Sequence, residues 1–228
     1  MRHSNAYSIE GNYRERVSKW IAVFSVVGFL MIYQIIISNA SRYVADYFFG
    51  SPAILAVFSL AFSAFSATLI YFILWNLFDK YIWKASVLRR WHHLDDFSGI
   101  WVGVGHTSFN DTRYKFKLSV QQTFTRMSCD VETVNSRSGA ILMGVIRDHA
   151  MSKERRLHMA YVNGVWSDDA KWNKTWPDSH LGFCSYRLEE EKLFGDYFTN
   201  SSPQTRGTIE LKRIDPCLED KWLDLIEP

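Results

Sequence analysis

The chain has 228 residues, enough for one domain of ordinary size together with a membrane anchor. Its formal net charge of +2 is too small to indicate electrostatic binding of nucleic acid, so no nucleic-acid polymer is expected as a partner. The three cysteines, Cys129, Cys184 and Cys217, are far apart and form no CxxC pair. This pattern argues against a disulfide framework or a zinc site and fits a reducing compartment.

Two long apolar runs predict a pair of transmembrane helices. Residues 20–38 and residues 53–78 contain no charged side chain, and each is long enough to cross a hydrocarbon core of about 30 Å. The segment 39–52 between them carries Arg42 and Asp46 and predicts a short loop, so the two helices would form a hairpin. A cleaved signal peptide is the alternative for the first run, but its apolar stretch begins late, and the second run would still anchor the chain.

Basic residues predict the orientation of this hairpin. Four of them precede the first helix within residues 1–19, and four more lie in the juxtamembrane linker 79–96, whereas the loop has one. By the positive-inside rule, the N-terminus and the domain after the helices are expected in the cytoplasm.

The second apolar run has a face of small residues. Ser59, Ser63 and Ser66 follow helical spacing, which predicts close helix packing, either against the first helix or between protomers. Neither run contains Asp, Glu, Lys or Arg, so a dedicated ion or proton path is not expected.

From residue 97 the apolar pattern changes to a period of two, as in residues 114–122. About eight short strands are predicted between residues 97 and 214, with a bulge or bend near Thr125 and a C-terminal tail at 215–228. The expected fold is membrane-anchored and all-β: a two-helix hairpin followed by a small, lipocalin-like antiparallel barrel with room for one small ligand.

Several polar side chains share the predicted inward face of this barrel. Gln122 continues the stripe of residues 114–120, Tyr161 shares a face with Leu157, and Tyr197 and Thr199 share one with Leu193. Such groups either hydrogen bond to backbone inside a filled barrel or line a ligand pocket, and the sequence leaves both readings open.

At this point the chain resembles a known family. The motifs, in chain order, are FSGIWVG (97–103), VQQTFTR (120–126), HLGF (180–183), GDYFTN (195–200) and TRGTIEL (205–211). Together with the two-helix prefix they resemble bacterial CBASS anti-phage effectors, which are CD-NTase-associated membrane proteins with two transmembrane helices and a cyclic-dinucleotide-binding β-barrel. The likeness covers nearly the whole chain.

The resemblance implies a multi-pass protein of the bacterial inner membrane that works without enzymatic activity or a cofactor. A phage-responsive nucleotidyltransferase would make a cyclic dinucleotide, and the barrel would bind it. Protomers would then assemble, the helices would disrupt the lipid bilayer, and the cell would die before phage mature, an outcome known as abortive infection.

A cyclic dinucleotide needs aromatic faces for two bases, donors for two phosphodiesters and polar groups for base edges. For His180 a structural hydrogen bond is an equal alternative. The candidate contacts are Trp101, Gln122, Thr123, Arg126, Tyr161, Asn163, His180, Tyr197, Thr199 and Arg206.

Two other classes of function are suggested by parts of the sequence. The clusters His92–His93 with Asp95–Asp96, and Asp168–Asp169, invite a metal or acid–base interpretation, but no HExxH, GxSxG, P-loop or Cys–His signature accompanies them. A membrane-tethered carrier of a small apolar ligand is the second alternative, and it would show an apolar cavity without converging basic and polar groups.

Overall fold

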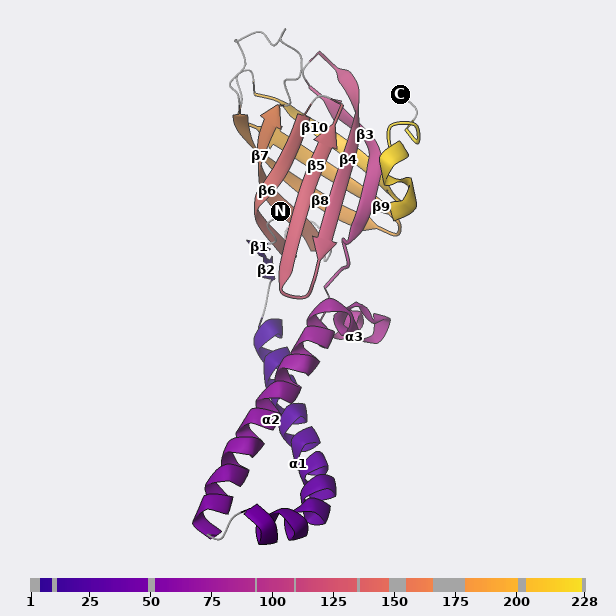
Figure 1. The fold of residues 1–228 in the computed structure, drawn as a ribbon. Coiled ribbons are helices and arrows are strands. Elements are labelled where there is room, and N and C mark those ends of the chain that lie inside the picture. The colour runs from indigo at the N-terminus through magenta and orange to yellow at the C-terminus, as the bar shows by residue number, and fades with distance from the viewer. Residues whose placement is uncertain are drawn as a thin grey trace. The chain divides into compact units, whose positions relative to one another are not determined.

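The computed structural model describes residues 5–9, 12–48, 52–92, 94–108, 110–134, 136–147, 155–165, 179–200 and 204–226, and the side chains of residues 34–60 lie outside this description. The chain divides into two units (Figure 1). One is helical and comprises Asn12–Leu88, and the other is a β unit formed by Met1–Gly11 together with Arg89–Pro228. The two units are described separately.

The helical unit contains α1 (Tyr13–Phe48), α2 (Pro52–Lys80) and the short helix η1 (Ile82–Lys84), and α3 (Ser86–His92) follows. The loop expected at 39–52 is therefore wrong over most of its length, because α1 continues to Phe48. Between residue 39 and Gly50 the sequence contains no glycine or proline, so nothing in this segment ends the helix earlier. The linker expected at 79–96 is likewise partly helical.

One face of α1 is buried at every fourth residue, namely Val17, Ile21, Ser25 and Phe29. The Oγ of Ser18 lies 3.0 Å from the hydroxyl of Tyr71, which joins α1 to α2. On α2, Phe65, Leu69 and Phe72 are exposed, whereas Ser63 and Ser66 are half-buried. The described serines thus lie on a more covered side of α2 than the phenylalanines do, and the side chain of Ser59 lies outside the described residues.

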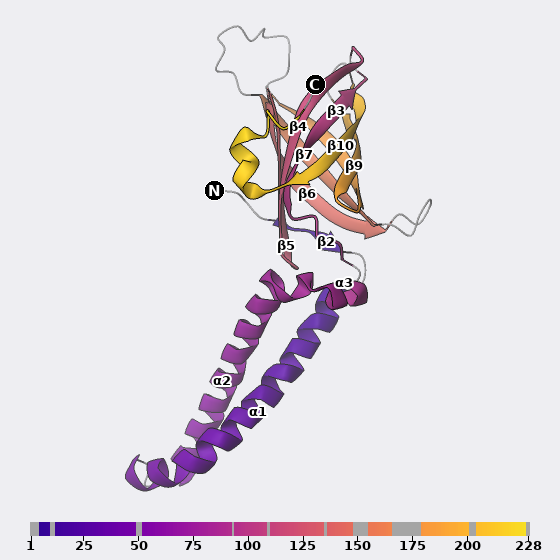
Figure 2. The same ribbon diagram turned by 90° about the vertical axis from the view of Figure 1, so that its right-hand side faces the viewer.

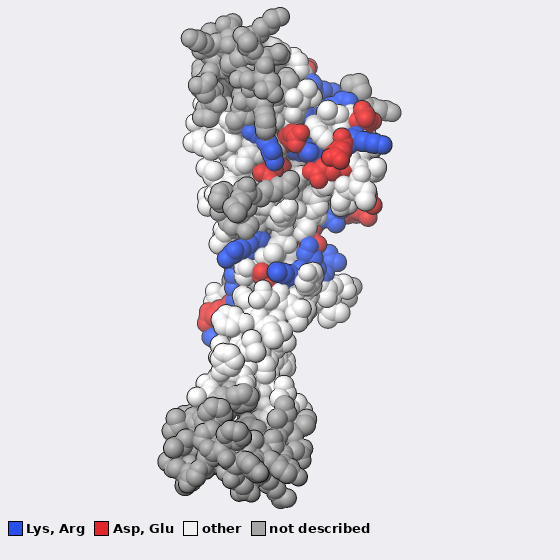
Figure 3. Space-filling view, viewed as in Figure 1, with Lys and Arg blue, Asp and Glu red and all other residues white. Residues whose placement is uncertain are grey.

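Among the described residues one stretch, Tyr13–Tyr33, is long and apolar enough to cross a membrane. In Figure 3 the described surface of the helices is largely uncharged, while basic and acidic side chains intermingle over the barrel. The second apolar run does form a helix, but its crossing of the membrane stays a prediction.

The β unit contains the expected antiparallel barrel of eight strands. These are β3 (Gly99–Thr107), β4 (Thr112–Gln122), β5 (Arg126–Thr133), β6 (Ser136–Arg147), β7 (Arg155–Val165), β8 (Ser179–Glu189), β9 (Lys192–Thr199) and β10 (Arg206–Ile214). Their order is β5-β4-β3-β10-β9-β8-β7-β6, and a further pairing of β5 with β6 closes the barrel. Closure leaves every one of these strands with two neighbours.

An N-terminal segment, residues 5–9, completes the barrel wall, which the sequence analysis did not predict. β5 and β6 pair directly only where Asp130–Glu132 meets Arg137–Gly139. Farther along, β1 (Asn5–Ala6) pairs with β5, and β2 (Ser8–Ile9) runs parallel to β6 (Figure 2). Residues 1–19 are therefore not merely a flank of the first helix, because Met1–Gly11 belong to the β unit.

The predicted bulge near Thr125 is a tight turn between two strands. β4 ends at Gln122, β5 begins at Arg126, and Gln122 pairs with Met127 across the hairpin. The backbone N–H of Thr123 donates to the carbonyl of Arg126 at 2.8 Å. Two inward stripes joined by so short a turn look, in sequence, like one strand that changes phase.

The C-terminal residues are likewise more than a tail. Asp215 caps the short helix η2 (Pro216–Lys221), and its carboxylate accepts from the N–H of Cys217 at 2.8 Å. Beyond η2, Trp222 and Ile226 pack with Ile100 and Val102.

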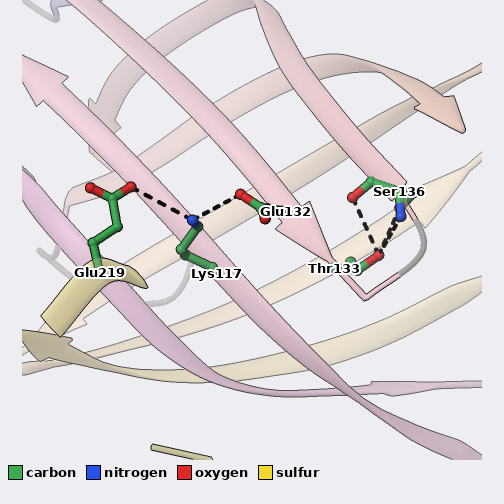
Figure 4. Close-up of polar contacts among 5 residues, drawn as sticks. All are labelled: Lys117, Glu132, Thr133, Ser136 and Glu219. Atoms are coloured by element: carbon green, nitrogen blue, oxygen red, sulfur yellow. Dashed lines mark hydrogen bonds and ion pairs between the residues drawn. The ribbon is translucent and has the colours of Figure 1, made fainter. Parts of the chain in front are cut away.

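Lys117 links this C-terminal segment to the barrel through ion pairs and a contact with an aromatic ring. Its ammonium lies 2.8 Å from a carboxylate oxygen of Glu132 and 3.6 Å from one of Glu219 (Figure 4). The same ammonium lies 5.5 Å from the centre of the Trp222 ring. The outer face of β4 is thus tied to η2 by charge and by an aromatic ring.

Candidate functional site

One half of the barrel interior is filled and the other half is hollow. The filled half, which we call the closed end, contains fully buried Trp101, Leu118, Met127, Leu157 and Leu193. The opposite half, the cavity end, holds a cavity of about 270 Å³. All eight strands contribute to its lining, which consists of Thr107, Tyr114, Phe116, Val131, Thr133, Val134, Ser136, Ser138, Tyr161, Asn163, His180, Cys184, Tyr197, Thr199, Thr205 and Ile209.

Three cross-strand pairs of glycine and tyrosine at the cavity end explain why space remains inside the barrel. In each pair the glycine lies directly opposite the tyrosine, and a Cβ on the glycine would overlap the tyrosine ring. Each tyrosine ring therefore occupies the space that a side chain on the opposite glycine would fill, beside the wall of the barrel. The pairs are Gly105–Tyr114, Gly182–Tyr161 and Gly207–Tyr197, and a fourth pair of the same kind, Gly195–Tyr186, lies away from the cavity lining.

The cavity offers neutral donors and acceptors. Burial raises the pKa of Tyr161, and burial together with the neighbouring Tyr197 ring raises the pKa of Tyr114, so both remain protonated phenols near neutral pH. Burial also raises the pKa of the Cys184 thiol to about 12, which keeps it an unreactive thiol. None of the lining residues that the structure describes is Lys, Arg, Asp or Glu.

A chain of hydrogen bonds crosses β6, β7 and β8 at the cavity. The Ser138 hydroxyl donates to Oδ1 of Asn163 at 2.8 Å, and Nδ2 of Asn163 lies 3.3 Å from Nε2 of His180. In this arrangement the amide donates to an unprotonated Nε2, which favours the neutral ring with its proton on Nδ1. Burial lowers the pKa of His180 and so acts in the same direction.

Two further pairs of hydroxyl groups lie where hairpins turn at the cavity end. Thr133 and Ser136 face each other with their oxygens 2.8 Å apart (Figure 4), and Thr199 and Thr205 do the same at 2.8 Å. In both pairs the first threonine also accepts the backbone N–H of the second residue, at 3.1 Å and 3.2 Å. One local arrangement thus occurs twice in the cavity wall.

Of the ten predicted contact residues, five lie in this cavity: Tyr161, Asn163, His180, Tyr197 and Thr199. They come from β7, β8 and β9, which the barrel fold brings together. Whether they touch a ligand stays a prediction, but their convergence on one cavity is a finding of the structure.

Gln122 and Trp101 lie at the closed end, where structural partners satisfy them. Oε1 of Gln122 accepts from the N–H of Phe97 at 2.8 Å, and its Nε2 donates to the Tyr7 hydroxyl at 3.3 Å and to the carbonyl of Asp95 at 3.2 Å. The indole N–H of Trp101 donates to the carbonyl of Phe97 at 2.9 Å, and Arg213 lies over its ring. Gln122 does share the inward stripe, but the period of a strand gives the face and not the depth along the barrel.

The remaining three candidates also lie away from the cavity. Thr123 accepts from the N–H groups of Thr125 and Arg126 in the β4–β5 turn, and the Arg126 side chain is exposed. Arg206 is exposed as well and pairs in register with Phe198, which is itself exposed. The structure gives no support to these residues as ligand contacts.

The cavity lining also contains residues that the sequence did not predict. Tyr114 carried a usable signal, because it begins the inward stripe that ends at Gln122. The hydroxyls of Thr133, Ser136 and Thr205 carried none, since threonine and serine at strand ends are common in ordinary turns.

The clusters considered for catalysis have structural surroundings where they are described. Oδ1 of Asp96 accepts from the N–H of Ser98 at 3.0 Å, and the Asp95 carbonyl is one of the partners of Gln122. His93, Asp168 and Asp169 lie outside the described residues. Within the part of the chain that the structure describes, no group of three His, Cys, Asp or Glu residues could hold a metal ion.

Residues 93–213 match the family described as Cap15, cyclic dinucleotide receptor domain, and this range is more than half of the chain. The chain belongs to the Cap15 family. It is also similar to CD-NTase-associated protein 15 of Yersinia aleksiciae, with 28% identity over 206 residues, which make up 89% of this chain and 93% of that protein. The matched receptor domain of this Cap15 chain contains the whole lining of the cavity.

Proposed function

We propose that the barrel of this Cap15 chain binds a cyclic dinucleotide in the cavity described above. The single observation that carries the proposal is the position of that cavity, lined by tyrosines, hydroxyls and an Asn–His pair, within the matched receptor domain. Its volume of about 270 Å³ is slightly below the roughly 300–1,000 Å³ that is usual for small-molecule sites.

The lining suits a nucleotide better than an apolar cargo. Twelve of the sixteen lining residues carry a hydroxyl, an amide, an imidazole or a thiol. An apolar ligand would offer these groups no hydrogen-bonding partner, whereas the bases, sugars and phosphates of a nucleotide offer several. The basic residues expected for the phosphates are missing from the described lining, so neutral donors carry the recognition.

We further propose that the chain acts as an effector of a CBASS anti-phage system. The name of its Yersinia relative associates that protein with a CD-NTase, which supports a functional link to an enzyme that makes cyclic nucleotides. Ligand binding would lead to assembly of protomers, and α1 and α2 would cross and then disrupt the bacterial inner membrane, with the N-terminus and barrel in the cytoplasm. The long, predominantly apolar stretch within Tyr13–Tyr33 supports the membrane association.

Thermal unfolding of the full chain in detergent micelles tests the ligand. The panel comprises cyclic di-AMP, cyclic di-GMP, cyclic di-UMP and the mixed cyclic dinucleotides, with the linear dinucleotides as matched controls. A ligand that binds only the folded barrel should stabilise it by about 2.7 kcal/mol at a hundredfold excess over Kd. A shift with one cyclic dinucleotide supports the proposal, while a folded protein that responds to none of them contradicts it.

Membrane damage is tested in bacterial cells that express the chain together with an enzyme that makes the ligand found in the panel. Entry of a membrane-impermeant dye should require both proteins. Dye entry without the ligand-producing enzyme, or intact membranes despite bound ligand, would contradict the effector role and leave the sensor role standing.

A further inference from the structure

The hydroxyl of Tyr161 lies in the cavity wall without a hydrogen bond to any residue that the structure describes. Its side chain is only 8% exposed, and its ring is held against Gly182 of the neighbouring strand. Buried polar groups in folded proteins almost always have a hydrogen-bond partner. The position of this hydroxyl in the lining therefore indicates that a molecule inside the cavity supplies the partner.

The amide of Asn163 retains half of its hydrogen-bonding capacity. A carboxamide has two N–H donors and two lone pairs on its oxygen. The Ser138 hydroxyl takes one lone pair at 2.8 Å, and Nε2 of His180 takes one N–H at 3.3 Å. One N–H and one lone pair remain, and no other described residue takes them. Asn163 also lines the cavity, so both remaining groups are available to a ligand there.

The barrel register fixes this amide and places it beside the tyrosine. Ser138 on β6 and His180 on β8 are the direct cross-strand partners of Asn163 on β7. The amide cannot turn about its side-chain bond without breaking a hydrogen bond to one of these two strands. Tyr161 and Asn163 are two residues apart on β7, so they share the inward face of that strand. The unsatisfied hydroxyl and the half-satisfied amide thus form one preorganised set.

The edge of a nucleobase fits this set better than a phosphate does. Nucleobases carry a donor next to an acceptor on their edges, and a side-chain amide can bind both at once. A phosphodiester offers only acceptors, so the remaining lone pair of the Asn163 oxygen would face a negative charge. The Tyr161 hydroxyl can donate or accept, and it can serve a third group on the same base.

We propose that Tyr161 and Asn163 form a subsite that binds the edge of one base of the ligand, and that Ser138 and His180 hold the Asn163 amide in position. The inference rests on the proposed function and adds to it which groups contact a base. His180 is then a positioning residue, which acts on the ligand through Asn163.

Affinity measurements on the full chain in detergent micelles test the subsite. The natural probe is the cyclic dinucleotide of the panel that binds most tightly. In one analogue both bases are replaced by apolar aromatic isosteres without hydrogen-bonding groups, and in a second both phosphodiesters are replaced by uncharged methylphosphonates. The variants are Asn163→Leu and Tyr161→Phe. The matched controls are Gln121→Leu, at an exposed position, and Tyr186→Phe, outside the cavity lining.

Both variants should lose affinity for the natural probe and not for the isostere analogue. We expect a loss of about tenfold for Asn163→Leu and of about threefold to tenfold for Tyr161→Phe, as for the removal of hydrogen bonds to a neutral group. The isostere analogue should bind both variants as it binds the wild type, because it has no edge for the subsite to bind. The penalty for the methylphosphonate analogue should stay as in the wild type, and the controls should match the wild type throughout. Melting temperatures without ligand establish that every variant is folded.

A double-mutant cycle tests the positioning role of His180. His180→Phe removes the acceptor of the Asn163 N–H and should weaken binding of the natural probe about threefold to tenfold. His180→Gln should restore most of this affinity, because its side-chain oxygen can accept the same N–H. In the Asn163→Leu background, His180→Phe should cause no further loss. An equal loss in both backgrounds, without rescue by His180→Gln, would show that His180 does not act through Asn163.

The outcomes separate this inference from the proposed function. If the wild type binds a cyclic dinucleotide, and Asn163→Leu and Tyr161→Phe bind it within about twofold of the wild type, the subsite is wrong and the sensor role stands. The base assignment also fails if these variants lose affinity equally for the natural probe and the isostere analogue. A reduced penalty for the methylphosphonate analogue would instead place a phosphate at these residues. If the wild type binds none of the natural ligands of the panel, the proposed function itself fails.

Discussion

Tyr161 and Gly182 lie opposite each other in the β7–β8 ladder, and the Tyr161 ring occupies the space that a side chain at position 182 would need. Gly182→Ala should therefore push this ring toward the cavity, with a strain of about 1–3 kcal/mol, and weaken ligand binding about tenfold. Titration of the variant with the ligand found in the panel measures the change. Gly139→Ala is the control, because no atom lies within 4 Å of the added methyl group, and equal affinity of both variants would contradict the role of this pair.

Gln122 should contribute to stability and not to ligand binding. Gln122→Leu leaves the buried N–H of Phe97 without its acceptor and removes a donor from Tyr7, so we expect a loss of about 2–4 kcal/mol in the free energy of unfolding. Chemical denaturation measures this loss, and Kd at a temperature where the variant is folded should match the wild type. Gln121→Leu, an exposed neighbour, should have little effect on either quantity. A large change in Kd with unchanged stability would show instead that Gln122 contacts the ligand.

Tyr7 should hold the N-terminal segment in the barrel wall. Its side chain is buried, and its hydroxyl lies 3.2 Å from the carbonyls of Thr123 and Phe124. Tyr7→Ala should cost about 3–5 kcal/mol of stability, and Tyr7→Phe about 1 kcal/mol. Hydrogen exchange of the backbone amides in β5 and β6 should speed up in Tyr7→Ala. Ser8→Ala, at an exposed position, is the control, and unchanged exchange in Tyr7→Ala would show that the segment is dispensable.

His180 should make stability depend on pH in the mildly acidic range. Burial lowers its pKa in the folded state below the ordinary value of about 6.5, so the unfolded chain binds more protons between the two pKa values. The free energy of unfolding should therefore fall as the pH drops through 6.5 toward the folded pKa, and change no further below it. His180→Gln should show a smaller slope than the wild type in this window. An equal slope in both proteins would assign the pH dependence to other groups.

The serine face of α2 should matter for killing and not for ligand binding. Ser63 and Ser66 are half-buried, and replacing Ser59, Ser63 and Ser66 by leucine would fill the space that allows helices to approach closely. Toxicity in cells that make the ligand should be lost, while the barrel keeps its affinity. Phe65→Leu, at an exposed position, serves as the control. Undiminished toxicity of the serine variant would show that this face is not the assembly contact.

The sequence predicted the barrel because the alternation of apolar and polar residues depends only on which face of its own strand each side chain occupies. Each strand from β3 to β10 has one face toward the interior, so apolar residues recur with a period of two, and eight such strands are enough to close. The Asp215–Pro216 pair also carries a helix-start signal, a capping carboxylate followed by proline, within the segment that was expected only as a C-terminal tail. The two strands of residues 5–9 had no signal, since two residues show no periodicity.

The sequence by itself determined the apolar first helix, the inward faces of the strands, and five of the residues that line the cavity. Only the tertiary structure decided which end of the barrel is hollow, because alternation along a strand carries no information about depth. That decision depends on partners far apart in the chain: Tyr7 with Gln122 fills one end, and tyrosines over cross-strand glycines keep the other end open. The pairing of hydroxyls within the two hairpins was equally hidden, since threonine and serine near strand ends also occur in ordinary turns.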